Sequence, residues 1–184
     1  MNFLRNWISR SRDRSGQALI EFMFVAFILL FMLFGMIDFC RAISTRQVLI
    51  NLSREAANLA ARGTGSTADE SISNALSSVI AGAAPLSIAT NGLVIITAVF
   101  NSNGTFLVTN QISEGGLSNS VISKVAPDGI GHPAAHMPPT AVPIPQANQT
   151  MFVSEVFYSY KPATPIGKLL NFNMTNALYD AAFF

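Results

Sequence analysis

Residues 16–41 read GQALIEFMFVAFILLFMLFGMIDFCR, and this stretch decides the fold of the chain. No charged residue occurs between Phe22 and Ile37. As a helix, the apolar run from Ala18 to Cys40 rises about 34 Å, enough to cross a hydrocarbon core of roughly 30 Å. The stretch therefore predicts one membrane-spanning helix with lipid as its partner.

Residues 1–16 precede this run and carry four arginines: Arg5, Arg10, Arg12 and Arg14. A secretory signal is cut at small residues that follow its apolar core. Here the small residue, Gly16, comes before the core, and the carboxylate of Glu21 lies just inside it. This order predicts cleavage on the cytoplasmic side and retention of the apolar helix. Charge alone gives the orientation only a small bias, since Arg41, Arg46 and Arg54 follow the span within about 20 residues.

The helical pattern continues beyond the apolar run, because residues 41–62 contain neither Gly nor Pro. We expect one helix from about 17 to 62. At 100° per residue, the second half of this helix has an apolar arc, formed by Val48, Leu49, Leu52, Ala56, Leu59 and Ala60. Polar side chains lie on the opposite side: Gln47, Asn51, Arg54, Asn58 and Arg62. This half is amphipathic and needs a partner surface.

A second helix is expected at the start of the outer domain, residues 63–184. Gly63-Thr64-Gly65 ends the first helix, and Thr67 with Glu70 forms a capping-box pattern for a helix over 68–83. Its apolar positions are Ile72, Leu76, Val79 and Ile80. We expect these side chains to pack on the apolar arc of the first helix.

About three strands are expected in the same domain. Residues 92–100 and 105–112 are rich in Val, Ile, Thr and Phe, and the connection between them has the chemistry of a hairpin turn. Residues 149–160 alternate and predict a third strand. The Pro-rich residues 127–148 predict a long loop, and a short helix or strand is expected within 166–184. A small antiparallel sheet packed on helices gives the α+β class.

The composition limits the classes of function. The formal net charge is +1, and no basic face for nucleic acid is evident. Cys40 is the only cysteine, which excludes a disulfide within the chain. His132 and His136 are four residues apart, but neighbouring prolines argue against a helix and no third ligand is in sight, so no zinc site is expected. No nucleophile elbow, phosphate loop or carboxylate cluster occurs, so we expect neither an enzyme nor a cofactor.

A block of short motifs between residues 15 and 62 resembles the TadE-like family, the minor pseudopilins of tight-adherence (Tad/Flp) pilus systems. The positions that carry the resemblance are Gly16-Gln17-Ala18, Glu21-Phe22, Gly35, Ile37-Asp38-Phe39, Arg41-Ala42, Gln47 and Arg54-Glu55-Ala56-Ala57. The chain departs from the family at Phe27, where a proline is often found. A proline kink is therefore not expected at that point.

The resemblance implies that a prepilin peptidase cuts after Gly16 and leaves Gln17 as the new amino terminus. Glu21 of an incoming subunit would then neutralise the terminal amine of its neighbour. The implied organisation is a cytoplasmic leader (1–16), a transmembrane and assembly helix (17–62) in the bacterial inner membrane, and a periplasmic or extracellular domain (63–184). The implied partners are the peptidase, other pilins and minor pseudopilins, the inner-membrane assembly platform and its ATPase. The implied work is structural, in the initiation, assembly or tip of an adhesive pilus.

Simpler interpretations stand beside these roles. Glu21 is alternatively an interfacial carboxylate that meets water. Asp38 and Arg41 are three residues apart and can pair at the outer membrane boundary, as an assembly contact or as a solvated ion pair. Gly35 permits close helix approach or is neutral. Cys40 is expected to be a buried or interfacial thiol rather than an acylated or cross-linked one.

Two other classes of function remain as alternatives to the pseudopilin. The first is an uncleaved, single-pass anchored envelope protein whose outer part is a binding module. It shares the topology of a pseudopilin and differs in that the chain is not cut after Gly16. The second is a periplasmic enzyme, which would require a convergent polar pocket that the sequence does not suggest.

Overall fold

The computed structural model describes residues 2–63, 65, 67–134, 137, 144–165 and 177–184, with side chains from residue 16 onward. The chain divides into two compact units. The first unit consists of Met1–Arg41 with Pro162–Phe172, and the second consists of Ala42–Lys161 with Asn173–Phe184.

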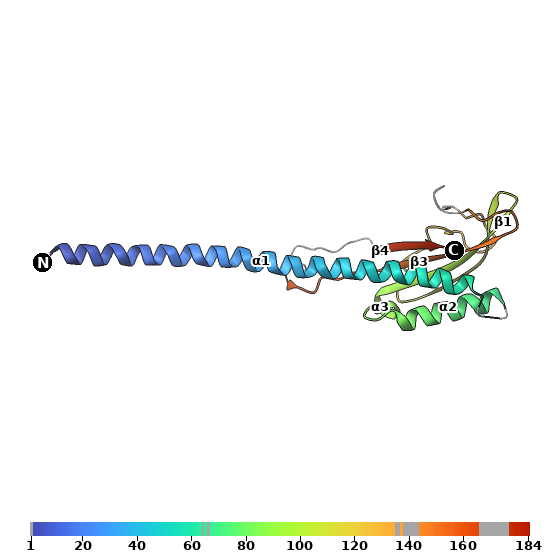
Figure 1. Cartoon of the computed structure of the whole chain (residues 1–184), viewed down its shortest axis with the longest axis horizontal. Coiled ribbons are helices and arrows are strands. Elements are labelled where there is room, and N and C mark those ends of the chain that lie inside the picture. Colours follow the sequence, from blue (N-terminus) through green and yellow to red (C-terminus); the bar gives the residue numbers. More distant parts are fainter. Residues whose placement is uncertain (1, 64, 66, 135–136, 138–143, 166–176) are drawn as a thin grey trace. The chain divides into compact units, whose positions relative to one another are not determined.

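The first element, α1, is a single α-helix over Asn2–Ala61 (Figure 1). It confirms the long N-terminal helix but begins well before residue 17, where the sequence placed its start. No proline interrupts residues 2–16, and a single glycine within a helix costs only about 1 kcal/mol relative to alanine, so Gly16 does not end it. The part of α1 from Gly16 to Ala61 is long and apolar enough to cross a membrane.

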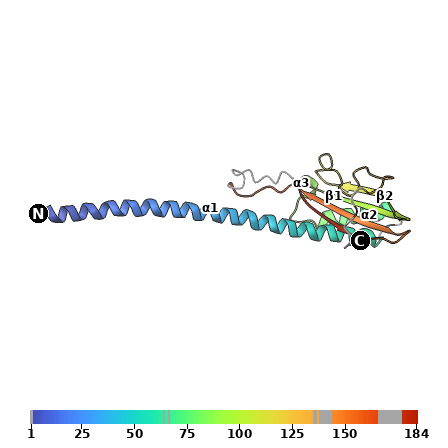
Figure 2. The same cartoon turned by 90° about the horizontal axis from the view of Figure 1, so that it is seen from above.

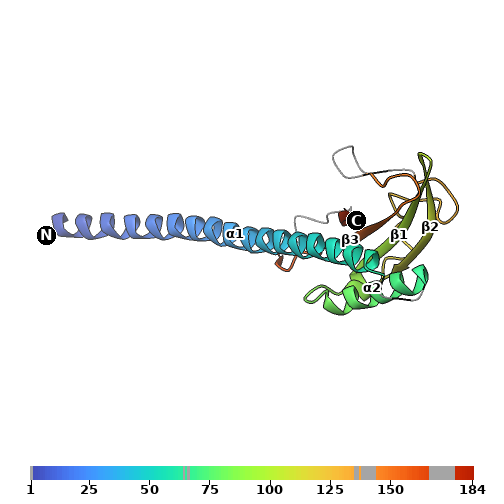
Figure 3. The same ribbon diagram turned by 45° about the vertical axis from the view of Figure 1, so that its right-hand side comes forward.

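Two further helices belong to the second unit. Helix α2 spans Ala68–Gly82, and its N-cap is Thr67, whose side chain accepts a hydrogen bond of 3.2 Å from the backbone N–H of Glu70. This contact is one half of the predicted capping box. The short helix α3, Ile88–Asn91, leads directly into the sheet and was not predicted. Figure 3 shows α2 running beside the C-terminal end of α1.

Four antiparallel strands form the sheet of the second unit: β1 (Gly92–Ser102), β2 (Thr105–Glu114), β3 (Thr150–Tyr158) and β4 (Leu178–Phe183). Their order is β2-β1-β3-β4, and Figure 2 shows β1 and β2 side by side. The predicted hairpin is present, with Ser102 opposite Thr105 across a turn in which Asn103 and Gly104 have positive φ. The sequence predicted about three strands, and the fourth lies where a helix or a strand had been left open.

One face of the sheet packs on the helices. The shared core contains Leu49, Leu52, Ala56 and Ala60 from α1, Ile72, Ala75, Leu76 and Val79 from α2, and Val94, Ile96, Ala98 and Val156 from the strands. The predicted apolar arc of α1 is therefore confirmed as a buried surface. Burial of these side chains away from water supplies the main stabilisation of this layer.

The opposite face of the sheet is covered by the chain between β2 and β3. Two smaller clusters form there, one around Val99, Val125, Met151 and Val153, and one around Leu93, Ile95 and Phe157. Within the Pro-rich region, residues 131–134 run along the edge of β2, where Val108 donates a backbone hydrogen bond of 3.0 Å to His132. Both faces of β1 and β3 are therefore buried, which explains the almost continuous burial along these strands.

Candidate functional site

The apolar part of α1 exposes large hydrophobic side chains on all sides. Phe22 is 71% exposed and Met36 is 68% exposed, and the same holds over most of the stretch from Leu19 to Ile43. A helix that is apolar all round is stable only when lipid or other helices surround it. This surface is the first candidate site, and its chemistry is that of the bilayer interior.

Polar groups mark the beginning of this surface. The side-chain amide of Gln17 donates a hydrogen bond of 3.1 Å to Oε1 of Glu21, one helical turn later, and both side chains are exposed. A Cβ built on Gly16 would meet no atom within 4 Å. The packing of the described chain therefore does not require glycine at position 16.

A second group of polar contacts lies within the first unit, near the C-terminal end of the apolar stretch. Oδ1 of Asp38 accepts hydrogen bonds from the backbone N–H groups of Ala163 (2.9 Å) and Thr164 (3.1 Å). Oδ2 accepts a third, of 2.5 Å, from the hydroxyl of Thr164. The sequence had placed Asp38 beside Arg41, and it contained no signal for these partners because they are more than a hundred residues away.

A buried carboxylate in the second unit was missed altogether. Glu155 on β3 is 0% exposed, and its carboxylate accepts hydrogen bonds from the hydroxyl of Ser123 and from the backbone N–H of Lys124 (2.9 Å) and Val125 (3.3 Å). The hydroxyl of Tyr179 on β4 donates a fourth bond, of 3.0 Å. Burial, together with the charge of Glu155, raises the pKa of the Tyr179 hydroxyl. This cluster fastens the segment after β2 to the sheet and needs no ligand for its stability.

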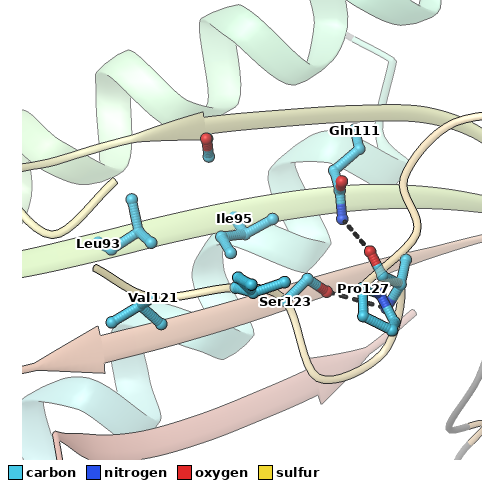
Figure 4. A pocket seen from close by; sticks show the side chains of 9 residues that line it. Leu93, Ile95, Gln111, Val121, Ser123 and Pro127 are labelled. Atoms are coloured by element: carbon cyan, nitrogen blue, oxygen red, sulfur yellow. Dashed lines mark hydrogen bonds between the residues drawn. The ribbon is translucent and has the colours of Figure 1, made fainter. Parts of the chain in front are cut away.

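A hollow of about 210 Å³ lies next to this cluster, between β1, β2 and the segment that follows β2 (Figure 4). Leu93, Ile95 and Val121 line its apolar part. Two of its polar side chains are engaged within the protein, since Gln111 donates to Thr97 and to the carbonyl of Ala126, and Ser123 donates to Glu155. The hollow therefore offers contact area rather than a set of reactive groups.

The remaining sequence candidates do not converge. His132 contributes its backbone carbonyl to the contact with β2, while His136 lies outside the described residues. Among the residues that the structure describes, no group of three His, Cys, Asp or Glu side chains could hold a metal ion. Cys40 is exposed on α1 in this single chain. Of the two expected positions, buried or interfacial, its exposure fits only the interfacial one. A Cβ on Gly35 would, like one on Gly16, meet no atom within 4 Å.

Comparison with known proteins identifies one part of α1. This part runs from the Gln17–Glu21 contact through Asp38 to the buried arc. Residues 16–58 match the family model described as TadE-like protein. The TadE-like segment, as we call residues 16–58, begins at Gly16 and ends within the buried half of α1. The resemblance to the TadE-like family seen in the motifs is confirmed over these residues. Neither the curated proteins nor the solved structures gave a match to the chain.

Proposed function

We propose that the chain is a minor pseudopilin of a Tad/Flp pilus, processed by a prepilin peptidase after Gly16. The observation that carries the proposal is the position of Gly16. It is the first residue of the TadE-like segment, it directly precedes an exposed apolar helix, and the fold leaves open space around it. Packing does not require this glycine, and it lies at the boundary of a membrane helix. It is therefore well placed for recognition by a peptidase.

The helix itself supports a structural role in assembly. Before assembly, the all-round apolar surface from Leu19 to Ile43 would be stored in the inner membrane, with residues 1–16 in the cytoplasm and the α+β domain outside. After cleavage, the same surface would pack against pilins and other minor pseudopilins. Glu21 would then meet the new terminal amine of a neighbouring subunit, an ion pair favoured in a medium of low dielectric constant.

The implied machinery consists of the prepilin peptidase, the inner-membrane assembly platform and the assembly ATPase. The proposed role of the subunit is initiation, assembly or the tip of an adhesive pilus. The competing proposal is an uncleaved, membrane-anchored binding protein, which has the same helix and the same outer domain.

Intact mass and amino-terminal sequencing of the protein from its own membranes test the cleavage. We expect a mature chain that begins at Gln17 in cells with the peptidase and a chain that begins at Met1 in cells without it. The variant Gly16→Leu should remain unprocessed, whereas Gly35→Leu should be cut normally, because both glycines are helical and both have open space for a side chain. A chain that begins at Met1 in both strains would favour the anchored protein.

A further inference from the structure

The carboxylate of Asp38 binds a chain segment that is distant from it in sequence. Asp38 lies on α1, and Pro162, Ala163 and Thr164 belong to the same compact unit, although the whole sheet domain intervenes in sequence. Pro162 and Thr164 are buried, with Thr164 only 6% exposed, while Ala163 between them is exposed. The segment is therefore seated with alternate residues inward.

All three hydrogen bonds between these groups are made to one carboxylate. Two come from consecutive backbone N–H groups and one from a hydroxyl, at 2.9, 3.1 and 2.5 Å. A carboxylate that accepts from adjacent N–H groups behaves like the cap of a helix N-terminus. In a helix cap the acceptor comes from a residue close in sequence. Here Asp38 supplies this acceptor from a distant part of the chain.

We infer that Asp38 is the docking point that holds Pro162–Pro165 on α1 at the C-terminal end of the apolar stretch. Charge-assisted hydrogen bonds are stronger than neutral ones, whereas a solvated ion pair, as the sequence predicted for Asp38 and Arg41, contributes little. The role of the carboxylate is therefore to position this returning segment. The inference does not depend on cleavage after Gly16, because an anchored protein would have the same contact.

The contact also has a consequence for neighbouring helices. At 100° per residue, Met36 and Cys40 lie on the side of α1 away from Asp38, and both are exposed. With Pro162–Pro165 seated on the Asp38 side, another helix can approach this level of α1 only from the remaining sides.

Amide hydrogen exchange of the full chain in lipid nanodiscs tests the inference residue by residue. In the unmodified protein the amides of Ala163 and Thr164 should exchange slowly. In Asp38→Ala they should exchange roughly tenfold to a hundredfold faster, because both N–H groups lose a charged acceptor. The amides of β1 and β3 serve as the control for the fold and should not change.

Arg41→Gln is the matched control, since it removes the predicted ion pair and leaves all three hydrogen bonds. It should change the exchange of Ala163 and Thr164 by less than about threefold. If Arg41→Gln accelerates exchange as much as Asp38→Ala, or if neither does, the inference is wrong. Should Asp38→Ala fail to fold, Thr164→Val decides: it removes only the hydroxyl donor and should accelerate the same amides by about threefold to tenfold. Unchanged exchange in that variant would overturn the inference as well.

Discussion

The hydroxyl of Tyr179 on β4 donates a hydrogen bond of 3.0 Å to the buried carboxylate of Glu155 on β3. The two strands are neighbours, and the rings of Phe157 and Tyr179 pack with centroids 4.9 Å apart on the same face. Lys124 lies over the Tyr179 ring, with Nζ 3.8 Å from its centroid. A single carboxylate therefore connects β3, β4 and the segment after β2.

Replacing this carboxylate should destabilise the domain strongly. Glu155→Ala leaves four donors without their acceptor in the interior, and we expect a loss on the order of 3 kcal/mol in the free energy of unfolding. Denaturant unfolding of the full chain in detergent, followed by fluorescence, measures the change. Glu114→Ala, at the exposed end of β2, is the control and should shift stability by less than about 0.5 kcal/mol. Equal effects of the two substitutions would contradict the proposed importance of the cluster.

The stability of the domain should fall at high pH through Tyr179. Burial and the charge of Glu155 raise its pKa above the ordinary value of 10.0. Above about pH 10 the unfolded chain loses the phenolic proton while the folded chain keeps it, so the unfolded state binds fewer protons and stability decreases as pH rises. Thermal unfolding between about pH 8 and about pH 11 should show a smaller decrease in Tyr179→Phe than in the unmodified protein. Parallel decreases in the two proteins would exclude this contribution.

Two buried serines should respond in opposite ways to the same substitution. Ser154 on β3 is 0% exposed, and its hydroxyl has no hydrogen-bond partner among the described residues. Ser154→Ala should leave stability unchanged or raise it by up to about 1 kcal/mol, since no bond is lost. Ser53 on α1 is equally buried but donates to the carbonyl of Ile50 and to Asp180. Ser53→Ala should cost about 1 to 2 kcal/mol, and a reversed order of the two effects would contradict the assignment.

Gly115 should tolerate no side chain. Its φ is +145°, and a Cβ there would lie 2.4 Å from the carbonyl oxygen of Gly92. Gly115→Ala must therefore displace backbone at the start of β1, and we expect a loss of more than about 2 kcal/mol. Gly82→Ala, at the end of α2, meets no atom within 4 Å and should be neutral or stabilising. Thermal unfolding of the two variants distinguishes local strain from a general effect of alanine.

Under the proposed function, Glu21→Ala should separate processing from assembly. Cleavage after Gly16 should continue, because Glu21 lies more than one helical turn beyond the bond that is cut. Incorporation into pili should fall at least about tenfold, since the terminal amine would lose its counter-charge in an apolar medium. Immunoblots of sheared pili and of membranes give both quantities, with Glu55→Ala as the control on the exposed side of α1. Normal incorporation of Glu21→Ala would refute this role of the carboxylate.

Local patterns were sufficient to predict much of this fold. The arc through Leu49 and Ala56, the cap at Thr67 and the hairpin turn at Asn103-Gly104 depend on residues close together in sequence, and each is present in the structure. The strand β3 was also predicted correctly from its alternating sequence. The alternating pattern did not predict how deeply β3 is buried, because the chain between β2 and β3 covers the second face of the sheet.

The features that were missed depend on distant partners. Glu155 resembled an ordinary polar residue in an alternating strand, since its donors come from Ser123 and Tyr179, on either side of it in sequence. The sequence predicted a contact of Asp38 with Arg41, because helical spacing is visible in the sequence. The contact with Thr164 is not visible there. The strand β4 was ambiguous, because six residues of mixed polarity carry too little periodicity to distinguish helix from strand.

The ring of donors around Glu155 also determines how cooperatively the sheet can come apart. A carboxylate placed in the interior before its donors arrive is costly, and those donors come from segments 32 and 24 residues away. Removal of β4, or of the segment around Ser123, would leave the same charge partly unpaired inside the domain. A partly folded state in which only some of these segments are in place is therefore poorly stable. We expect β3, β4 and the Ser123 segment to unfold and refold together as one cooperative unit.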